Sequence, residues 1–476
     1  MDNSLEEIIK KFDRINQIPR CSKNEDRIAD YLENWAKENN FKVKRDSVNN
    51  IRIDVPASAD FEDPTTFIIQ GHMDMVCEKS PESGHDFAKD PIKSYREEGW
   101  LTADKTTLGA DNGIALALGM ELATSDEISH PPLALLFTVD EETGLTGAKA
   151  LKKDFLQGEY LINLDSETEG VFTVGCAGGE EVDLSKDYDL EENSCKNSFK
   201  IKIDGLKGGH SGIDINRNRL NASKVAITVL EHLKKIINFN LSEFSGGTAH
   251  NAIPRSAYAV ISTNFDSDKI KPKLSQIENN LKTKYSSYEP NLSLSLEKTE
   301  KQNQFLSKEK TDHFINFLDK MPHGVFTMSE MEGLVQSSDN LAIVNLEDGK
   351  MKIKISMRSS DIDVMNKLSE KINSIADNFD VNLEKGGKYP AWKPNFESDF
   401  LKKCLDVYNS LFQNKAKIEV IHAGLETGVI GSKRDRLDMI SIGPTIEDPH
   451  SPDEKIHIES IQKIWLFLKT LFESYK

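Results

Sequence analysis

Three short, nearly continuous apolar runs constrain the fold of this chain more than any other feature of its sequence. They occupy residues 66–70, 133–139 and 160–164, and each has the length of a β-strand. A strand whose successive side chains are all apolar is buried on both faces, which is typical of parallel sheets covered by helices. Residues 113–123 lie between the first two runs and are predicted to form a helix that is apolar on most sides. The sequence therefore predicts an α/β unit with a mostly parallel sheet.

The pattern changes in the middle of the chain. There the expected strands alternate apolar and polar side chains, as in residues 199–203 and 351–355. Such alternation is typical of antiparallel sheets with one face exposed to water. The predicted domains are a discontinuous first domain, residues 1–185 and 390–476, and an inserted α+β domain, residues 186–389. The insert, roughly 200 residues long, exceeds an ordinary single domain, so we expect it to be doubled.

Net charge and composition limit the kinds of partner and the cellular location that we expect for the chain. Its formal net charge is −18 at pH 7, and such an acidic chain repels nucleic acid and anionic membranes. No apolar run approaches the ~18 residues of a membrane span, and the first residues do not resemble a secretory signal. We therefore expect a cytoplasmic protein with no nucleic-acid or membrane partner. The five cysteines contain no Cys-x-x-Cys pair, which predicts reduced thiols without disulfides or a thiolate zinc site.

Carboxylate or imidazole side chains follow the expected buried strands. His72 comes at the end of the first strand, the Asp-Glu-Glu triplet at residues 140–142 follows the second, and Asp165 follows the third. A later strand is followed by His450, and Asp111 precedes the apolar helix. Because ligands bind at the carboxyl ends of the strands in open α/β sheets, we expect these side chains to share one crevice.

Several acidic groups in one crevice repel one another unless divalent cations neutralise them. Carboxylates and imidazoles suit zinc, manganese or cobalt, and one carboxylate could bridge two cations that each take a histidine and a further carboxylate. Such cations lie ~3.5–4 Å apart, lower the pKa of a bound water towards ~7 and polarise a carbonyl. Each residue alone has an ordinary explanation: Asp111 as a helix cap, Asp165 as a turn residue, and His450 as a loop histidine with His457 as its rival.

The same segments resemble the co-catalytic metallopeptidases, the group that includes aminoacylases, glutamate carboxypeptidases and carnosinases. Within this group the aminoacyl-histidine dipeptidases are the most similar. The resemblance spans nearly the whole chain in the expected order, and its segments are residues 71–76, 106–113, 140–144, 165–167, 175–179, 206–212, 246–255, 421–426 and 450–454.

The resemblance implies a role for each residue of the crevice. Five residues match the ligands of two divalent cations: His72, Asp111, Glu142, Asp165 and His450. Asp111 matches the bridging ligand, which in the family precedes a cis peptide. Asp74 matches the acid that orients His72, and Glu141 matches the general base.

The inserted domain matches the lid of the family. His210 is expected to stabilise the developing oxyanion, either within its own chain or across a dimer. Arg358 is expected to hold a substrate carboxylate. Asn251 and Gly424 match further positions that meet the substrate.

The implied activity is metal-dependent hydrolysis of dipeptides, including Xaa-His dipeptides. Glu141 would take a proton from the attacking water and return it to the leaving amine. The runner-up is a related amidohydrolase, such as an aminoacylase or a carboxypeptidase, with the same metal core; a non-catalytic binding relative would require the loss of a ligand or of the base. The expected cofactors are two divalent ions, Zn²⁺ in preference to Co²⁺ or Mn²⁺, and the expected partner is a small peptide. A homodimer is compatible with the resemblance, and the sequence leaves the oligomeric state open.

Overall fold

Two compact units make up the chain, of which the computed structural model describes residues 3–329, 333–434 and 436–476. Unit 1 comprises Met1–Cys176, Trp392–Val420 and Leu425–Lys476, and unit 2 comprises Ala177–Ala391 and Ile421–Gly424. The domain limits expected from the sequence lie near these divisions and remain a prediction. Each unit is described by itself.

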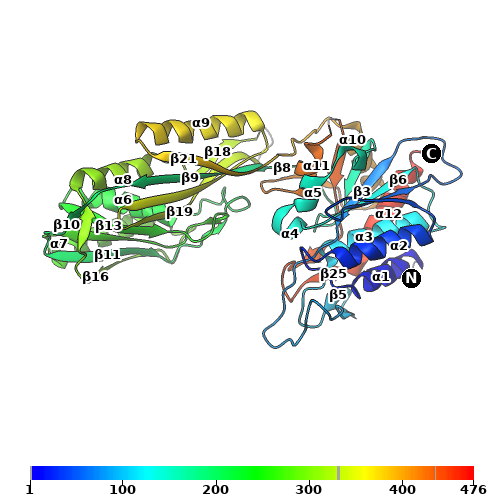
Figure 1. The fold of residues 1–476 in the computed structure, drawn as a ribbon, viewed down its shortest axis with the longest axis horizontal. Coiled ribbons are helices and arrows are strands. Elements are labelled where there is room, and N and C mark those ends of the chain that lie inside the picture. The colour runs from blue at the N-terminus through cyan, green and yellow to red at the C-terminus, as the bar shows by residue number, and fades with distance from the viewer. Residues whose placement is uncertain (1–2, 330–332, 435) are drawn as a thin grey trace. The chain divides into compact units, whose positions relative to one another are not determined.

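An eight-stranded sheet forms the centre of unit 1 (Figure 1). Its strands follow the order β1 (Lys42–Arg45), β2 (Ile51–Val55), β6 (Leu133–Thr138), β3 (Phe67–His72), β7 (Tyr160–Asn163), β23 (Asp438–Ser441), β8 (Val171–Cys176) and β22 (Lys417–Ile421). The central strands β6, β3, β7 and β23 are parallel, whereas β2 pairs antiparallel with β6 and β8 pairs antiparallel with β23; β1 in turn pairs antiparallel with β2. The predicted α/β class with a mostly parallel sheet is confirmed, and the three apolar runs are β3, β6 and β7.

The helices of unit 1 are α1 (Asn3–Ile15), α2 (Asp26–Glu38), α3 (Ala110–Thr124), α4 (Glu141–Gly144), α5 (Thr146–Ala150), α10 (Asp399–Leu411), α11 (Glu426–Gly431) and α12 (Ile458–Glu473), with a 3-10 turn η1 (Lys153–Phe155). A small sheet has the order β24 (Ile446–Glu447), β25 (Lys455–His457), β5 (Trp100–Ala103) and β4 (Ser94–Glu97). Within the part of the chain that is described, no helix combines the length and hydrophobicity that a bilayer crossing requires.

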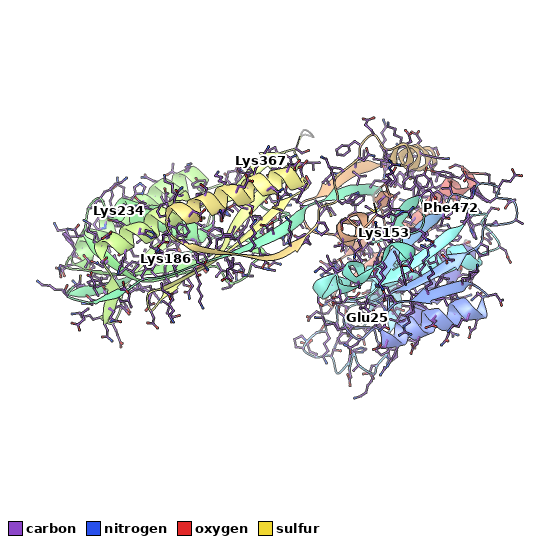
Figure 2. The ribbon with its side chains drawn as sticks, turned by 45° about the horizontal axis from the view of Figure 1, so that its top comes forward. Glu25, Lys153, Lys186, Lys234, Lys367 and Phe472 are labelled. Atoms are coloured by element: carbon purple, nitrogen blue, oxygen red, sulfur yellow. A yellow bond between two sulfur atoms is a disulfide. The ribbon has the colours of Figure 1, made fainter. Side chains whose placement is uncertain are left out.

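Helices cover both faces of the large sheet. Alternate residues of its buried strands therefore belong to two different cores. Phe67 and Ile69 of β3 join a core with α1, α3 and α12, whereas Ile68 joins a second core with α5 and α11. Phe472 of α12, labelled in Figure 2, meets the ring of Phe67 edge-on with centroids 5.3 Å apart. This two-sided burial explains why β6 is apolar along almost its whole length and why β3 begins with three consecutive apolar residues.

A nine-stranded antiparallel sheet forms unit 2. Its strands follow the order β16 (Ser293–Lys298), β11 (Asn197–Asp204), β15 (Ala257–Thr263), β13 (Phe239–Gly246), β19 (Val335–Glu347), β20 (Lys350–Ser359), β9 (Gly178–Asp187) and β21 (Asn382–Tyr389), and β18 (Gly324–Met328) also pairs with β19. Two short ladders join β10 (Leu190–Glu192) to β17 (Gln304–Leu306) and β12 (Gly209–His210) to β14 (Ala252–Ile253).

Four helices accompany the sheet of unit 2: α6 (Ala222–Leu233), α7 (Ser267–Tyr285), α8 (Lys308–Lys320) and α9 (Ile362–Asn378). Helix α6 contacts β11 and β15, and α7 contacts β16, at one end of the sheet. Helix α9 contacts β20 and β21 at the other end. Each half of the sheet therefore carries its own helices, as expected of a doubled domain.

The prediction of a chain without disulfides is wrong for one pair. Cys21 and Cys77 form a disulfide with their Cα atoms 5.7 Å apart, whereas Cys176, Cys195 and Cys404 are free and buried. An isolated parallel bridge between Cys21 and Met75 brings the two segments together. The half-cystines are 56 residues apart. Only the tertiary contact between these distant segments could reveal the pairing.

Candidate metal centre

His72 ends strand β3 with its imidazole oriented by Asp74. Its Nδ1 lies 3.1 Å from the main-chain oxygen of Asp74 and 3.3 Å from Oδ1 of the same residue. Both atoms are acceptors, so Nδ1 keeps a proton and Nε2 is the atom available to a cation. Nε2 lies 3.0 Å from Asp111 Oδ1 and 3.4 Å from Asp165 Oδ1.

Asp111 presents its two carboxylate oxygens to two different histidines. Oδ1 faces His72, and Oδ2 lies 3.2 Å from Nε2 of His450. The cis peptide expected after Asp111 is present. The next residue, Asn112, accepts the main-chain N–H of His72 at 3.1 Å and donates to the main-chain oxygen of Leu164 at 2.8 Å. Its amide therefore ties the start of α3 to the ends of β3 and β7.

Glu142 and His450 complete a second group around the other oxygen of Asp111. His450 Nε2 lies 3.0 Å from Glu142 Oε2. Glu142 Oε1 is buried and has no hydrogen-bond partner among the described residues. The rival histidine, His457, ends strand β25 and packs against Trp100 with ring centroids 4.9 Å apart. Of the two histidines, His450 is the one that lies beside Asp111 and Glu142.

The donor atoms fit two cations that share one carboxylate. His72, Asp111 and Asp165 form one group, and Asp111, Glu142 and His450 form another, with all donor atoms of a group within 4.8 Å of one another. Two ligands of one tetrahedral ion at ~2 Å would lie ~3.3 Å apart. The separations of 3.0–3.4 Å between the facing atoms match this value. The unpartnered oxygen of Glu142 is a further donor for such an ion.

The electrostatics of the cluster favour cations. Burial raises the pKa of Asp165 to about 6 and that of Glu167 to about 7. Burial, reinforced by neighbouring carboxylates, raises the pKa of Glu141 well above its usual range. Hydrogen bonds to two carboxylates raise the pKa of His450 to about 11, and the carboxylates around His72 raise its pKa as well, although burial opposes this. In the metal-free protein, protons therefore supply the positive charge that divalent cations would provide.

Asp74 positions more than His72. Its carboxylate is fully buried and accepts the main-chain N–H groups of Glu141 at 3.1 Å and Glu142 at 3.3 Å, together with the Ser22 hydroxyl at 2.8 Å. Burial alone would raise the pKa of Asp74, but the hydrogen bonds, first from His72, lower it to about 2. The carboxylate of Asp74 thus anchors the predicted ligands His72 and Glu142 and the predicted base Glu141.

The predicted substrate-binding residues belong to unit 2, not to the unit that carries these groups. His210 Nδ1 accepts the main-chain N–H groups of Gly212 and Ile213, each at 3.2 Å, so its proton is on Nε2 and can be donated. Burial and the nearby Arg358 lower the pKa of His210, which keeps the ring neutral. Arg358 on β20 donates to the Tyr389 hydroxyl at 2.9 Å.

The other two predicted substrate residues also lie in unit 2. Asn251 is exposed beside β14, and its main-chain oxygen accepts the N–H of Ser211 at 2.8 Å. A Cβ on Gly424 would lie 2.6 Å from the ring of Tyr389, so only glycine fits there without displacing that ring. Gly424 is thereby linked through Tyr389 to Arg358.

Sequence reasoning missed two buried groups that lie close to predicted site residues. Glu426, 1% exposed, accepts Gln70 at 2.6 Å and Thr138 at 2.8 Å, and burial raises its pKa to about 7. In unit 2, His422 lies 2.7 Å from the hydroxyl of Ser338, and burial with Arg358 nearby lowers the pKa of its imidazole to about 3. Both residues lie in segment 421–426, which is one of the segments that resemble the family. That resemblance was the one feature of the sequence that could have identified them.

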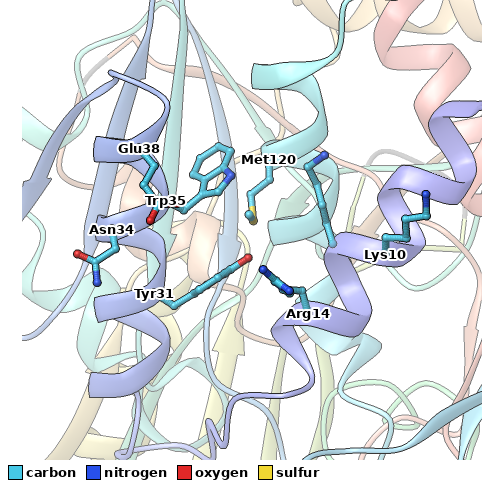
Figure 3. Close-up of a pocket in the computed structure, with 8 residues that line it drawn as sticks. Lys10, Arg14, Tyr31, Asn34, Trp35, Glu38 and Met120 are labelled. Carbon is cyan, nitrogen blue, oxygen red and sulfur yellow. The ribbon is translucent and has the colours of Figure 1, made fainter.

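A groove of about 700 Å³ between α1, α2 and α3 is separate from these groups (Figure 3). It is lined by Lys10, Lys11, Arg14, Tyr31, Asn34, Trp35, Glu38 and Met120. The two lysines already form ion pairs, with Glu7 and Glu121, and the arginine hydrogen-bonds to Tyr31. None of the predicted site residues lines the groove, so we do not include it in the candidate site.

Comparison with known proteins identifies the family. Residues 68–474 match the model of peptidase family M20/M25/M40. The chain is 37% identical over 467 residues to a cytosol non-specific dipeptidase of Escherichia coli K12, covering 97% of this chain and 96% of that relative. The crystal structure of an aminoacylhistidine dipeptidase from Vibrio alginolyticus matches with a TM-score of 0.92 and 36% identity over 98% of this chain and 96% of that one. A Staphylococcus aureus tripeptidase, 16% identical with a TM-score of 0.56 over 99% of this chain and 98% of its own, shares the fold. The chain belongs to peptidase family M20/M25/M40.

Proposed function

We propose that this protein is a metal-dependent dipeptidase that hydrolyses dipeptides, including Xaa-His dipeptides. The observation that carries the proposal is the pair of donor groups that share Asp111, each with one histidine and one further carboxylate. The names of the E. coli and Vibrio relatives, which match almost the whole chain, support dipeptides as the substrate class.

Each donor group would hold one cation. His72 and Asp165 would bind one ion, Glu142 and His450 the other, and Asp111 both. When bound, two divalent cations supply a water of lowered pKa and polarise the scissile carbonyl. Zn²⁺ is the proposed metal because imidazole and carboxylate ligands suit it, with Co²⁺ and Mn²⁺ as alternatives.

Glu141 is the proposed general base. It takes a proton from the attacking water and gives it to the leaving amine. The main-chain N–H groups of Glu141 and Glu142 donate to the same carboxylate, that of Asp74, which holds the segment that carries both side chains.

Residues of unit 2 are proposed to bind the substrate. The Nε2–H of His210 would donate to the developing oxyanion, in its own chain or across a homodimer, and Arg358 would bind the carboxylate end of the dipeptide. Asn251 and Gly424 would line the same subsite. The net charge of −18 supports a small peptide, rather than nucleic acid or an anionic membrane, as the partner, and we propose a cytoplasmic location.

Exchange of each glutamate for glutamine tests the mechanism. Glu141→Gln keeps the size of the side chain but cannot take a proton, so we expect turnover at least ~10²-fold slower with both metals retained. Glu142→Gln should instead weaken one metal site, and excess metal should restore part of its activity. Near-normal turnover by Glu141→Gln would refute the assigned base, and loss of metal from that variant alone would mean that the two roles are exchanged.

A substrate panel tests the substrate class. The metal-reconstituted protein would be assayed with dipeptides, including Xaa-His dipeptides, with N-acyl amino acids and with longer peptides. Preferential hydrolysis of dipeptides is expected. Hydrolysis of N-acyl amino acids alone would favour an aminoacylase, and binding of metal without any hydrolysis would favour a non-catalytic relative.

A further inference from the structure

Two buried charged side chains outside the proposed mechanism lie on either side of the segment that leads into α3. This segment, residues 108–111, is called the ligand loop because it ends at Asp111. Arg20 contacts a main-chain oxygen of this segment, and Glu454 contacts its main-chain N–H groups. Arg20 is 1% exposed and Glu454 is 2% exposed. Burying charged groups costs free energy unless their contacts compensate it.

Arg20 links the ligand loop to the segment that follows His72. Its Nη2 donates to the main-chain oxygen of Gly109 at 2.6 Å. Its Nη1 donates to the main-chain oxygens of Met73 and Asp74, each at 3.2 Å. The planar guanidinium presents its donors in fixed directions, so one side chain sets the spacing between the two segments.

The ligand loop is shaped to receive this guanidinium. A Cβ placed on Gly109 or on Gly113 would lie 2.5 Å from Nη2 of Arg20. Gly109 also has a φ of 70°, which a side chain would disfavour. Any other residue at these two positions would push Arg20 away from the loop.

Glu454 links the ligand loop to the turn that carries His450. Its Oε2 accepts the main-chain N–H groups of Leu108 at 2.7 Å and Gly109 at 2.9 Å. Its Oε1 accepts the N–H of Asp111 at 3.2 Å. Three main-chain N–H groups of the loop donate to this one buried carboxyl group, so the contact ties the loop to the turn.

We propose that Arg20 and Glu454 are positioning residues of the metal centre, and that together they fix Asp111 between His72 and His450. Asp111 faces these histidines with different oxygens, at 3.0 and 3.2 Å. Cation–ligand distances tolerate only about 0.2 Å, so Asp111 can serve both ions only if its main chain is held relative to both histidines. The inference rests on the proposed function and adds two residues to that site.

Charge supports the same inference. Burial lowers the pKa of Arg20 to about 10 against the effect of nearby carboxylates, Glu454 first, so the guanidinium remains charged at neutral pH. It thereby offsets part of the negative charge that the ligands concentrate.

Metal binding by variants of the full-length protein tests the proposal. Arg20→Lys keeps the positive charge but loses the planar guanidinium group, and Arg20→Met loses both. Glu454→Gln loses the negative charge and one acceptor oxygen. Co²⁺ would be titrated into the metal-free proteins, with its visible absorption reporting site geometry and chelator competition reporting affinity. We expect Co²⁺ affinity to fall about 10–100-fold, with a changed absorption spectrum, and Arg20→Lys to retain more affinity than Arg20→Met.

Two matched variants control for the loss of any buried charge. Arg52 in unit 1 is 4% exposed and donates to the main-chain oxygen of Phe155 at 2.8 Å. Glu289 in unit 2 is 1% exposed and accepts two main-chain N–H groups, at 2.8 and 3.0 Å. Arg52→Lys and Glu289→Gln should change the melting temperature of the metal-free protein as much as the test variants do, yet leave Co²⁺ affinity and spectrum unchanged.

The outcomes separate the positioning role from a purely structural one. Co²⁺ affinity within about threefold of the unmodified protein in both Arg20→Lys and Glu454→Gln would overturn the proposal, as would equal losses in the control variants. If an Arg20 variant does not fold, Glu454→Gln alone decides. An unmodified protein that binds no Co²⁺ and hydrolyses no dipeptide would instead overturn the proposed function, and the positioning role with it.

Discussion

Replacement of Asp74 by asparagine is expected to weaken the metal centre without emptying it. Asp74 accepts hydrogen bonds at both carboxylate oxygens: Oδ1 faces His72 Nδ1 and the N–H of Glu141, and Oδ2 faces the Ser22 hydroxyl and the N–H of Glu142. Asparagine has one acceptor oxygen, so one of these pairs must face its NH₂ group. Either two N–H donors or a hydroxyl and an N–H then lose their acceptor.

The expected loss of metal affinity follows from the hydrogen bonds that remain in Asp74→Asn. Each lost charge-assisted hydrogen bond is worth about 1.5–3 kcal/mol, so the local cost reaches about 3–6 kcal/mol before relaxation. The main-chain oxygen of residue 74 still lies 3.1 Å from His72 Nδ1 and can hold the useful tautomer. We therefore expect the loss typical of a residue that orients a metal ligand, about 10–100-fold in affinity, or about 1.4–2.7 kcal/mol.

Chelator competition with Zn²⁺ or Co²⁺ measures this loss, and turnover at saturating metal measures what remains. Turnover should stay low even then, because in either orientation of the asparagine the main chain of Glu141 or that of Glu142 loses its acceptor. Ser22→Ala removes one donor to Asp74 but leaves both carboxylate oxygens in place, so it is the graded control and should weaken binding less than Asp74→Asn does. Unchanged metal affinity and unchanged saturated turnover in Asp74→Asn would refute the assigned role.

Three further predictions concern stability, pH and substrate binding. Replacing Cys21 or Cys77 by serine opens a loop of 56 residues, so the oxidised protein should lose up to about 4 kcal/mol of unfolding free energy; an unchanged urea midpoint would contradict this. Because its carboxylate neighbours raise the pKa of His450 to about 11, a cation must displace its proton, and apparent metal affinity should rise about tenfold per pH unit between pH 6 and 8; titration in buffers with a pH indicator should show the released proton, and its absence would count against the ligand assignment. Gly424→Ala places a methyl group 2.6 Å from the ring of Tyr389, so KM should rise several-fold with metal content unchanged, whereas an unaltered KM would exclude Gly424 from the substrate subsite.

Much of unit 1 could be predicted because a strand buried on both faces contains consecutive apolar residues, and such a run can be recognised in a short stretch of sequence. Strands β3, β6 and β7 each contain a run of consecutive apolar residues, and the side chains at or after their carboxyl ends are the ones that the structure brings together. His72 and Asp165 could be proposed on this basis alone, since their positions relative to a strand end are fixed by a few residues of chain. Their roles, and that of Glu142 rather than Glu141 as the ligand, came from the resemblance to a family.

The partners of these residues depend on contacts between distant segments, which no local pattern records. Arg20 follows a helix by a few residues and nothing in its neighbours indicates that it binds Gly109, and the spacing of Cys21 and Cys77 carries no sign of their disulfide. His450 and His457 could not be told apart by sequence position. By itself, the sequence determined which segments are buried and which ends carry acids and imidazoles, because periodicity and composition are properties of the local chain. Only the tertiary structure decided which of these side chains face one another and which buried charges hold them, because those contacts join segments up to several hundred residues apart.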